Sequence, residues 1–69
     1  MASFYKEGMK IQFDGYRGDI IKITETYRKN VLVVKVKEHP KHIRNKESIT
    51  TIGLFEYPDG KLEFMTIID

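Results

Sequence analysis

The segment Tyr57-Pro58-Asp59-Gly60-Lys61 constrains the fold of this chain more than any other feature. Proline fixes φ at the first position of a tight turn, aspartate suits the second, and glycine supplies the left-handed third. The residues before and after this turn both have strand character. The sequence therefore predicts a β-hairpin that joins residues 49–57 to residues 61–68.

Strand periodicity also runs through the first part of the chain. Apolar and polar residues alternate over Met9–Phe13, which predicts a half-buried first strand. A turn over residues 14–18, with two glycines, leads into a second strand at residues 19–25. Strict alternation places Ile21 and Ile23 on one face of this strand.

The middle of the chain completes the β pattern. Residues 26–30 predict a polar turn in which Asn30 suits the left-handed region. Val31–Lys37 is rich in β-branched residues, which favour strands. Residues 38–47 interrupt the pattern with a proline and many charges, so we expect either an open loop there or one helical turn around residues 41–45. Gly53 lies inside the first hairpin strand and predicts a bulge or a sharp bend.

The fold class that follows is all-β, because no long stretch of the sequence has helical spacing. Five short strands fit a small barrel or a strongly twisted antiparallel sheet, since either arrangement removes or shortens exposed edges. With 69 residues the chain makes one small β domain, residues 1–69. It has no cysteine, so an apolar core or a second copy has to stabilise it.

Cysteine usage and hydropathy also bear on location. The absence of cysteine fits a reducing compartment. The longest apolar run, Val31–Val34, is far shorter than a membrane span, and the N-terminus lacks the apolar stretch of a signal peptide. We expect a cytoplasmic protein with no membrane partner.

The sequence also predicts which side chains of the strands are buried and which are exposed. The four phenylalanines expected in the core are Phe4, Phe13, Phe55 and Phe64. Glu56 and Glu63 fall on the solvent side of the alternating hairpin strands. The run Phe64–Ile68 is more apolar than one buried face requires. Either it is covered on both sides, or it exposes a patch for a protein partner or a second copy, which would give a homodimer.

Residues 7–23 carry a resemblance to a known family. Glu7-Gly8-Met9-Lys10-Ile11, followed by Gly15-Tyr16-Arg17-Gly18-Asp19-Ile20-Ile21-Lys22-Ile23, resembles the opening of SH3-like barrels of the KOW type. In that family a short apolar strand leads through a glycine turn into a "G-x-I-x-x-I" strand. The "V-x-V" pattern that follows there is similar to Val31–Val36. The resemblance covers the first half of the chain and implies a binding module rather than an enzyme.

Charge is distributed unevenly along the chain. Residues 28–46 contain seven basic side chains and one acidic one, whereas residues 47–69 contain one basic and five acidic ones. The first 27 residues have four of each sign. This polarity predicts that part of the surface meets an anionic partner.

The basic segment is the main candidate site. Spacing of two puts Lys35 and Lys37 on one strand face, and further basic residues follow on the next loop. Tyr27 is able to stack on a base, and Tyr16 beside Arg17 is a second candidate for stacking. The proposed nucleic-acid-binding residues are Tyr27, Arg28, Lys29, Lys35, Lys37, Lys41, His42, Arg44 and Lys46.

Catalysis and metal binding find little support in the sequence. Ser3 and Ser48 lie beside no obvious base, and the chain has no cysteine nucleophile. His39 and His42 are three residues apart, but no further ligand follows at a fixed spacing. We therefore expect neither an enzyme nor a metal or other cofactor.

Two functions remain open. The first is a non-catalytic module that binds DNA or RNA through residues 28–46. The second is a protein-interaction or accessory module, of the phage or regulatory type, which docks through the C-terminal hairpin or the basic loop.

Overall fold

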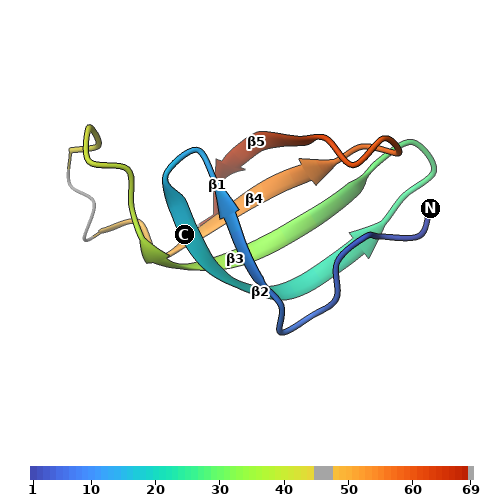
Figure 1. Ribbon diagram of the computed structural model, residues 1–69, viewed down its shortest axis with the longest axis horizontal. Helices are drawn as coiled ribbons and strands as arrows, with labels where there is room; N and C mark the ends of the chain where they lie inside the picture. The colour runs from blue at the N-terminus through green and yellow to red at the C-terminus, as the bar shows by residue number, and fades with distance from the viewer. Residues whose placement is uncertain (45–47, 69) are drawn as a thin grey trace.

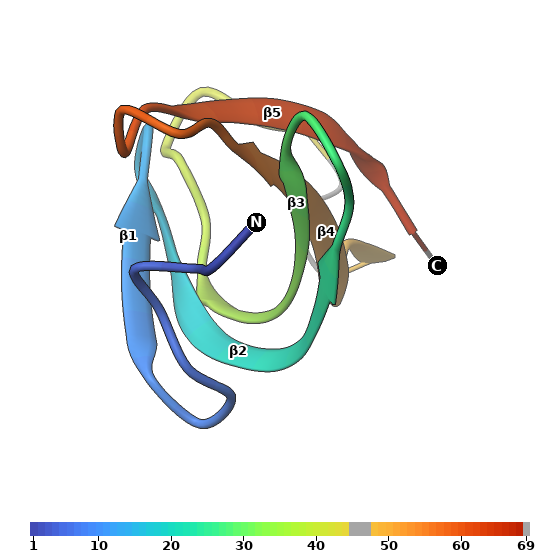
Figure 2. The ribbon, with the colours of Figure 1, turned by 90° about the vertical axis from the view of Figure 1, so that its right-hand side faces the viewer.

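The computed structural model describes residues 1–44 and 48–68, and these form a single curled antiparallel sheet. Its strands are β1 (Lys10–Phe13), β2 (Tyr16–Glu25), β3 (Asn30–Glu38), β4 (Thr51–Glu56) and β5 (Leu62–Ile67). Each strand pairs with the next in the order β1-β2-β3-β4-β5, so β1 and β5 are the two edges (Figure 1). Figure 2 shows the sheet curling into a half-barrel. The all-β prediction is confirmed.

The C-terminal hairpin is also confirmed. β4 and β5 are antiparallel neighbours, and Gly60 has a φ of 88° in the turn between them. The Tyr57 N–H donates to the Lys61 carbonyl, and the Asp59 side chain accepts from the Lys61 N–H. The predicted irregularity at Gly53 is present as a register shift between Gly53 and Leu54.

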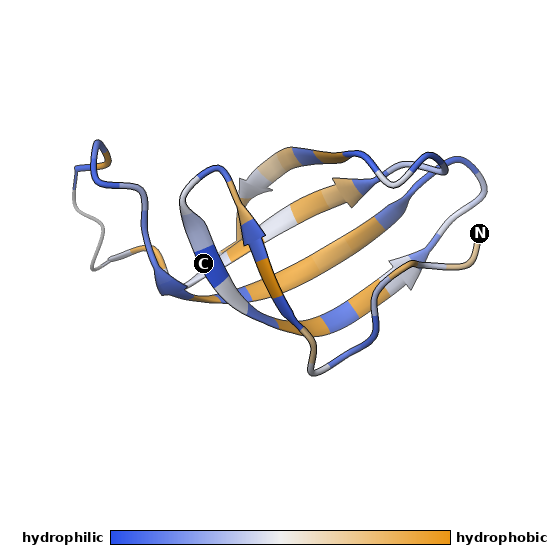
Figure 3. Ribbon diagram, viewed as in Figure 1, coloured by the Kyte–Doolittle hydropathy of each residue, from blue (hydrophilic) through white to orange (hydrophobic). Residues whose placement is uncertain are grey.

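The core lies on the concave side of the half-barrel. The buried apolar side chains are Ile11, Tyr16, Ile20, Leu32, Val34, Ile49, Ile52 and Leu54. Figure 3 shows the corresponding hydrophobic bands along the strands. None of the described residues forms a helix long and apolar enough to cross a membrane.

A bulge in β2 changes the faces that strict alternation predicts. The pairing of β2 with β3 shifts register between Ile20 and Lys22. Ile20 is buried and Ile23 packs against the core, whereas Ile21 is 51% exposed. Placing Ile21 and Ile23 on one face was therefore wrong, because one extra residue in a strand reverses the alternation beyond it.

The turn between β1 and β2 is shorter than the predicted 14–18. Asp14 and Gly15 both have positive φ, as in a two-residue hairpin turn, and β2 begins at Tyr16. Gly18 lies inside β2, where a Cβ would overlap the carbonyl oxygen of Lys35. A glycine is required here because β2 and β3 lie so close together.

Two polar residues lie deeper than the sequence indicated. Asn30 begins β3, is fully buried and does not have positive φ, so the prediction of a left-handed turn residue was wrong. Glu56, expected on the solvent side, is also fully buried. Its carboxylate accepts hydrogen bonds from the Ser3 hydroxyl at 2.6 Å, the Phe4 N–H at 2.7 Å and the Asn30 amide at 3.1 Å. Glu56 thereby holds the N-terminal segment across one end of the half-barrel.

The phenylalanines are less buried than predicted. Phe13 packs against the core, whereas Phe55 is half-buried outside the core cluster, so its assignment to the core was wrong. Phe4 is 67% exposed and Phe64 is 38% exposed, so their assignment to the core was wrong. The run Phe64–Ile68 belongs to an edge strand and its continuation, and Ile67 and Ile68 are exposed as well.

We predict that Glu56→Gln lowers the free energy of unfolding by about 1–3 kcal/mol. Both carboxylate oxygens of Glu56 accept hydrogen bonds, so the NH₂ group of glutamine would face a donor in either orientation of the amide. Urea unfolding followed by circular dichroism measures the change. Glu63→Gln is the matched control, since Glu63 is exposed and accepts only the Tyr57 hydroxyl among the bonds described. Its expected effect is below about 0.5 kcal/mol. Equal effects of the two substitutions would contradict the role given to Glu56.

Candidate nucleic-acid interface

The predicted basic residues are divided between the two ends of β3. The predicted site residues before β3, in the 26–29 turn, are Tyr27 and the basic Arg28 and Lys29, and those after it, on the loop, are Lys41, His42 and Arg44. Figure 1 shows this turn and this loop at opposite ends of the long axis. Lys46 lies outside the described residues. The basic segment of the sequence therefore does not converge on one surface.

In the 26–29 turn, the Lys29 side chain contacts two aromatic rings of the sheet and of the turn that follows β4. Its ammonium nitrogen lies 3.9 Å from the centroid of the Phe55 ring and 5.8 Å from that of Tyr57. A cation held over an aromatic face stabilises the packing of that face. Tyr27, in contrast, is 95% exposed and has no ring contact among the described residues.

At the loop end, the strand register brings further charges to Lys35 and Lys37. Asp19 on β2 is the cross-strand partner of Lys10 on β1 and of Lys35 on β3. The Lys37 ammonium lies 3.6 Å from the Asp19 carboxylate. Asp19 therefore has a lysine as its cross-strand partner on each neighbouring strand, and a third lysine, Lys37, within ion-pair distance of its carboxylate.

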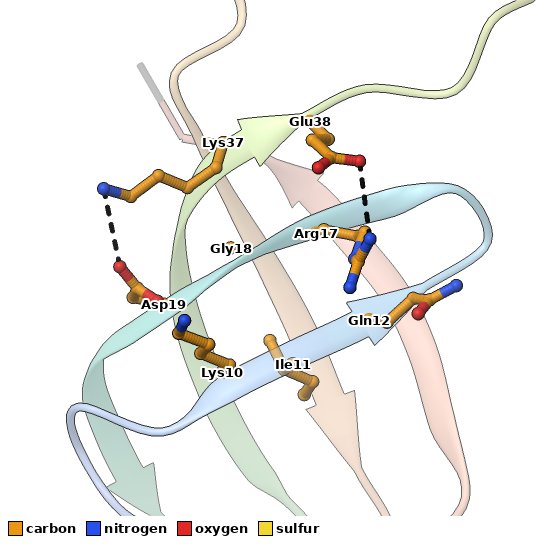
Figure 4. Close-up of a pocket in the computed structure, with 8 residues that line it drawn as sticks. All are labelled: Lys10, Ile11, Gln12, Arg17, Gly18, Asp19, Lys37 and Glu38. Carbon is orange, nitrogen blue, oxygen red and sulfur yellow. Dashed lines mark ion pairs between the residues drawn. The ribbon is translucent and has the colours of Figure 1, made fainter.

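Lys10, Asp19 and Lys35 form one row of side chains across the three strands, and a second row lies beside it. Arg17 is the partner of Gln12 on β1 and of Glu38 on β3, and its guanidinium lies 3.7 Å from the Glu38 carboxylate. Residues of both rows, together with Lys37, line a hollow of about 480 Å³ (Figure 4), and Lys35 lies outside this lining. In Figure 4 the side chains of Lys10 and Lys37 point toward Asp19 from opposite sides.

We call Lys10, Arg17, Lys35 and Lys37 the β1–β3 basic surface. With Asp19 and Glu38 included, four positive charges face two negative ones, a net charge of +2. In both ion pairs each side chain is at least 36% exposed. Exposed pairs are worth about 1 kcal/mol or less, so an incoming anion is able to replace either carboxylate.

Lys10 and Arg17 were not among the predicted site residues. Nothing in their local sequence marks them, because each stands in a segment with balanced charge. Their position beside Lys35 and Lys37 depends on the register of β1, β2 and β3. A hairpin pairing of residues 10–13 with residues 16–19 is the signal that would have identified them.

Tyr16 does not offer the stacking surface that the sequence suggested. It is 8% exposed, and its ring stacks on Phe64 with centroids 5.8 Å apart and an interplanar angle of 25°. Burial, and then the charge of Asp14, raise the pKa of the Tyr16 hydroxyl. The phenol therefore stays protonated at neutral pH.

The two histidines have different surroundings. His39 contacts the edge of Tyr16, and its Nε2 lies 2.5 Å from the Ile49 carbonyl, so the ring donates this hydrogen bond from Nε2. His42 is exposed on the loop. Within residues 1–44 and 48–68, no group of three or more histidine, cysteine or acidic side chains is placed to hold a metal ion.

Comparisons with protein-family models, with curated proteins and with solved structures found no match to this chain.

Proposed function

We propose that this domain binds nucleic acid, without catalysing a reaction, through the β1–β3 basic surface and the loop that follows β3. The observation that carries the proposal is the pair of cross-strand rows around the hollow in Figure 4, where three strands contribute cations to one place. Phosphate contacts from lysine and arginine supply most of the affinity in sequence-independent binding. Lys41 and Arg44 extend the positive charge onto the loop.

The character of the hollow favours binding over catalysis. Its ionisable groups are exposed except for Asp19, which is partly exposed, and its two carboxylates are paired with cations. Catalytic groups generally work in places from which water is excluded. The resemblance to KOW-type SH3-like barrels also supports a binding role. The absence of cysteine supports a cytoplasmic site of action.

We predict that Lys10→Gln combined with Lys35→Gln weakens nucleic-acid binding on the order of tenfold at low salt. The slope of log K against log[salt] should become shallower by about 0.7–0.9 for each lysine removed. These lysines are chosen because neither takes part in the two ion pairs. Titration with single-stranded DNA, duplex DNA and RNA at several salt concentrations measures both effects.

The control is Lys61→Gln, because Lys61 is an exposed lysine on the hairpin turn, away from the basic surface. It should change neither the affinity nor the slope. The proposed function fails if the unmodified protein binds none of the three nucleic acids at low salt. It also fails if Lys61→Gln has the same effect as the double substitution.

We predict that Asp19→Asn strengthens nucleic-acid binding by up to about fivefold. The substitution removes the carboxylate that competes with phosphate for Lys37, at a site where exposed pairs are worth about 1 kcal/mol or less. Asp59→Asn, on the hairpin turn, is the matched control and should leave the affinity unchanged. A loss of affinity in Asp19→Asn would mean that the surface does not receive an anion.

A second candidate function is protein interaction by strand addition along β5, which would suit an accessory factor. β5 is an edge of the sheet, and Phe64, Ile67 and Ile68 are exposed along it and its continuation. An apolar edge whose backbone groups are free on one side is a template for pairing with another strand. The partner strand that we favour is β5 of a second copy of this chain. β5 carries a single charge, Glu63, and two β5 strands can pair with an offset that keeps their Glu63 side chains apart.

We predict that the chain self-associates through this edge. Sedimentation equilibrium should give a mass that rises with concentration toward twice that of the chain, and Ile67→Lys should return it to the monomer, because a lysine on an edge opposes strand pairing. Thr24→Lys, an exposed position on the inner strand β2, is the control and should still associate. A constant monomer mass for the unmodified chain would exclude the homodimer.

A further inference from the structure

A second, smaller hollow lies where the half-barrel remains open. It measures about 200 Å³, and we call it the seam pocket. Its walls are formed chiefly by Phe13, Tyr16, Pro40, His42, Ile43 and Phe64. These residues come from the β1–β2 hairpin, the loop after β3, and the edge strand β5. The pocket exists because β1 and β5 are the two free edges of the sheet.

Aromatic rings dominate the pocket. The stacked pair of Tyr16 and Phe64 forms one side, and Phe13 lies next to Tyr16 as its cross-strand partner. Phe64 is 38% exposed although it is the partner of the buried Leu54 on β4. An exposed ring that faces the core side of an open sheet is a surface on which another flat ring can stack.

The loop side of the pocket is held in place by the fold. The hydrogen bond from His39 to the Ile49 carbonyl ties the two ends of the loop together. Pro40 is buried against Gly15, where a Cβ would come within 3.1 Å of it. The Ile43 N–H donates to the Pro40 carbonyl at 3.3 Å. These contacts shape the pocket before any ligand arrives, which reduces the entropy cost of binding.

Charge around the pocket indicates what kind of ring it accepts. Lys41, His42 and Arg44 are exposed on the loop that borders it, whereas Asp14 is the one acidic side chain in its lining. An apolar aromatic slot beside exposed cations is complementary to a flat base attached to a phosphate backbone.

We propose that the seam pocket accepts one unpaired base of a nucleic-acid strand, which stacks on Phe64 while its flanking phosphates contact Lys41 and Arg44. This inference rests on the proposed function and specifies the ligand as single-stranded. A base inside a duplex has to leave its stack to enter such a pocket, so a single strand binds in preference to the duplex.

The test compares Phe64→Leu with the unmodified chain on two single strands of equal length, one of thymidylate and one without bases. Loss of the aromatic face should weaken binding to the thymidylate strand by about tenfold and leave binding to the base-free strand unchanged. Phe4→Leu is the matched control, because Phe4 is an exposed phenylalanine that lies against the hairpin turn at Gly60. It should affect neither strand.

A second variant covers the case in which Phe64→Leu fails to fold. The chain has no tryptophan, so Phe64→Trp introduces a single indole at the pocket. Its fluorescence should be quenched by the thymidylate strand and not by the base-free strand.

Three results would overturn the proposal of a base site, and they differ in whether the proposed function is also excluded. Equal effects of Phe64→Leu on the two strands, or no effect on either, exclude the base site and leave the proposed function intact. Failure of the unmodified chain to bind either strand at low salt excludes both. A shift in the emission of Phe64→Trp on addition of a proline-rich peptide, with no change on addition of the thymidylate strand, assigns the pocket to a protein ligand.

Discussion

The buried carboxylate of Glu56 is the interaction on which this half-barrel depends most. The end of the half-barrel where β3 begins and β4 ends is covered by the N-terminal segment of the chain. Glu56 closes that end by binding Ser3 and Phe4 of the N-terminal segment and Asn30 at the start of β3. A buried charge is costly unless donors replace its water, and here three hydrogen bonds do so. The chain has no cysteine, and residues 1–44 and 48–68 form no second layer that could take over this role.

The sequence predicted what depends on local pattern and missed what depends on register. The hairpin at Pro58-Asp59-Gly60, the strand at Val31–Lys37 and the irregularity at Gly53 each follow from the residues involved. The predicted face of Ile21 was wrong because the bulge between Ile20 and Lys22 forms only when β2 pairs with β3. Glu56 was misplaced because alternation does not show that the N-terminal segment returns to supply hydrogen bonds.

The same limit applies to the candidate site. A block of basic residues in the sequence looked like one surface, but β3 separates its beginning from its end. In an antiparallel sheet, residues far apart in the chain become neighbours when their strands pair. Lys10 and Arg17 therefore join Lys35 and Lys37, although the segment that contains them has no excess of positive charge. Charge counted along a β chain therefore does not show which basic side chains share a surface, because strand pairing decides that.

The β1–β2 hairpin links the two surfaces proposed to meet nucleic acid. Gln12 and Arg17 face the outer hollow, and the next cross-strand pair, Phe13 and Tyr16, faces the seam pocket. A strand that contacts both surfaces has to pass the tip of this hairpin, where the carboxylate of Asp14 repels phosphate. The loop beside the tip carries Lys41, which offsets that repulsion. A single strand can bend sharply enough to follow this path, whereas a duplex is too stiff to do so. If a ligand occupies both proposed surfaces, the arrangement of the hairpin therefore favours a single strand over a duplex.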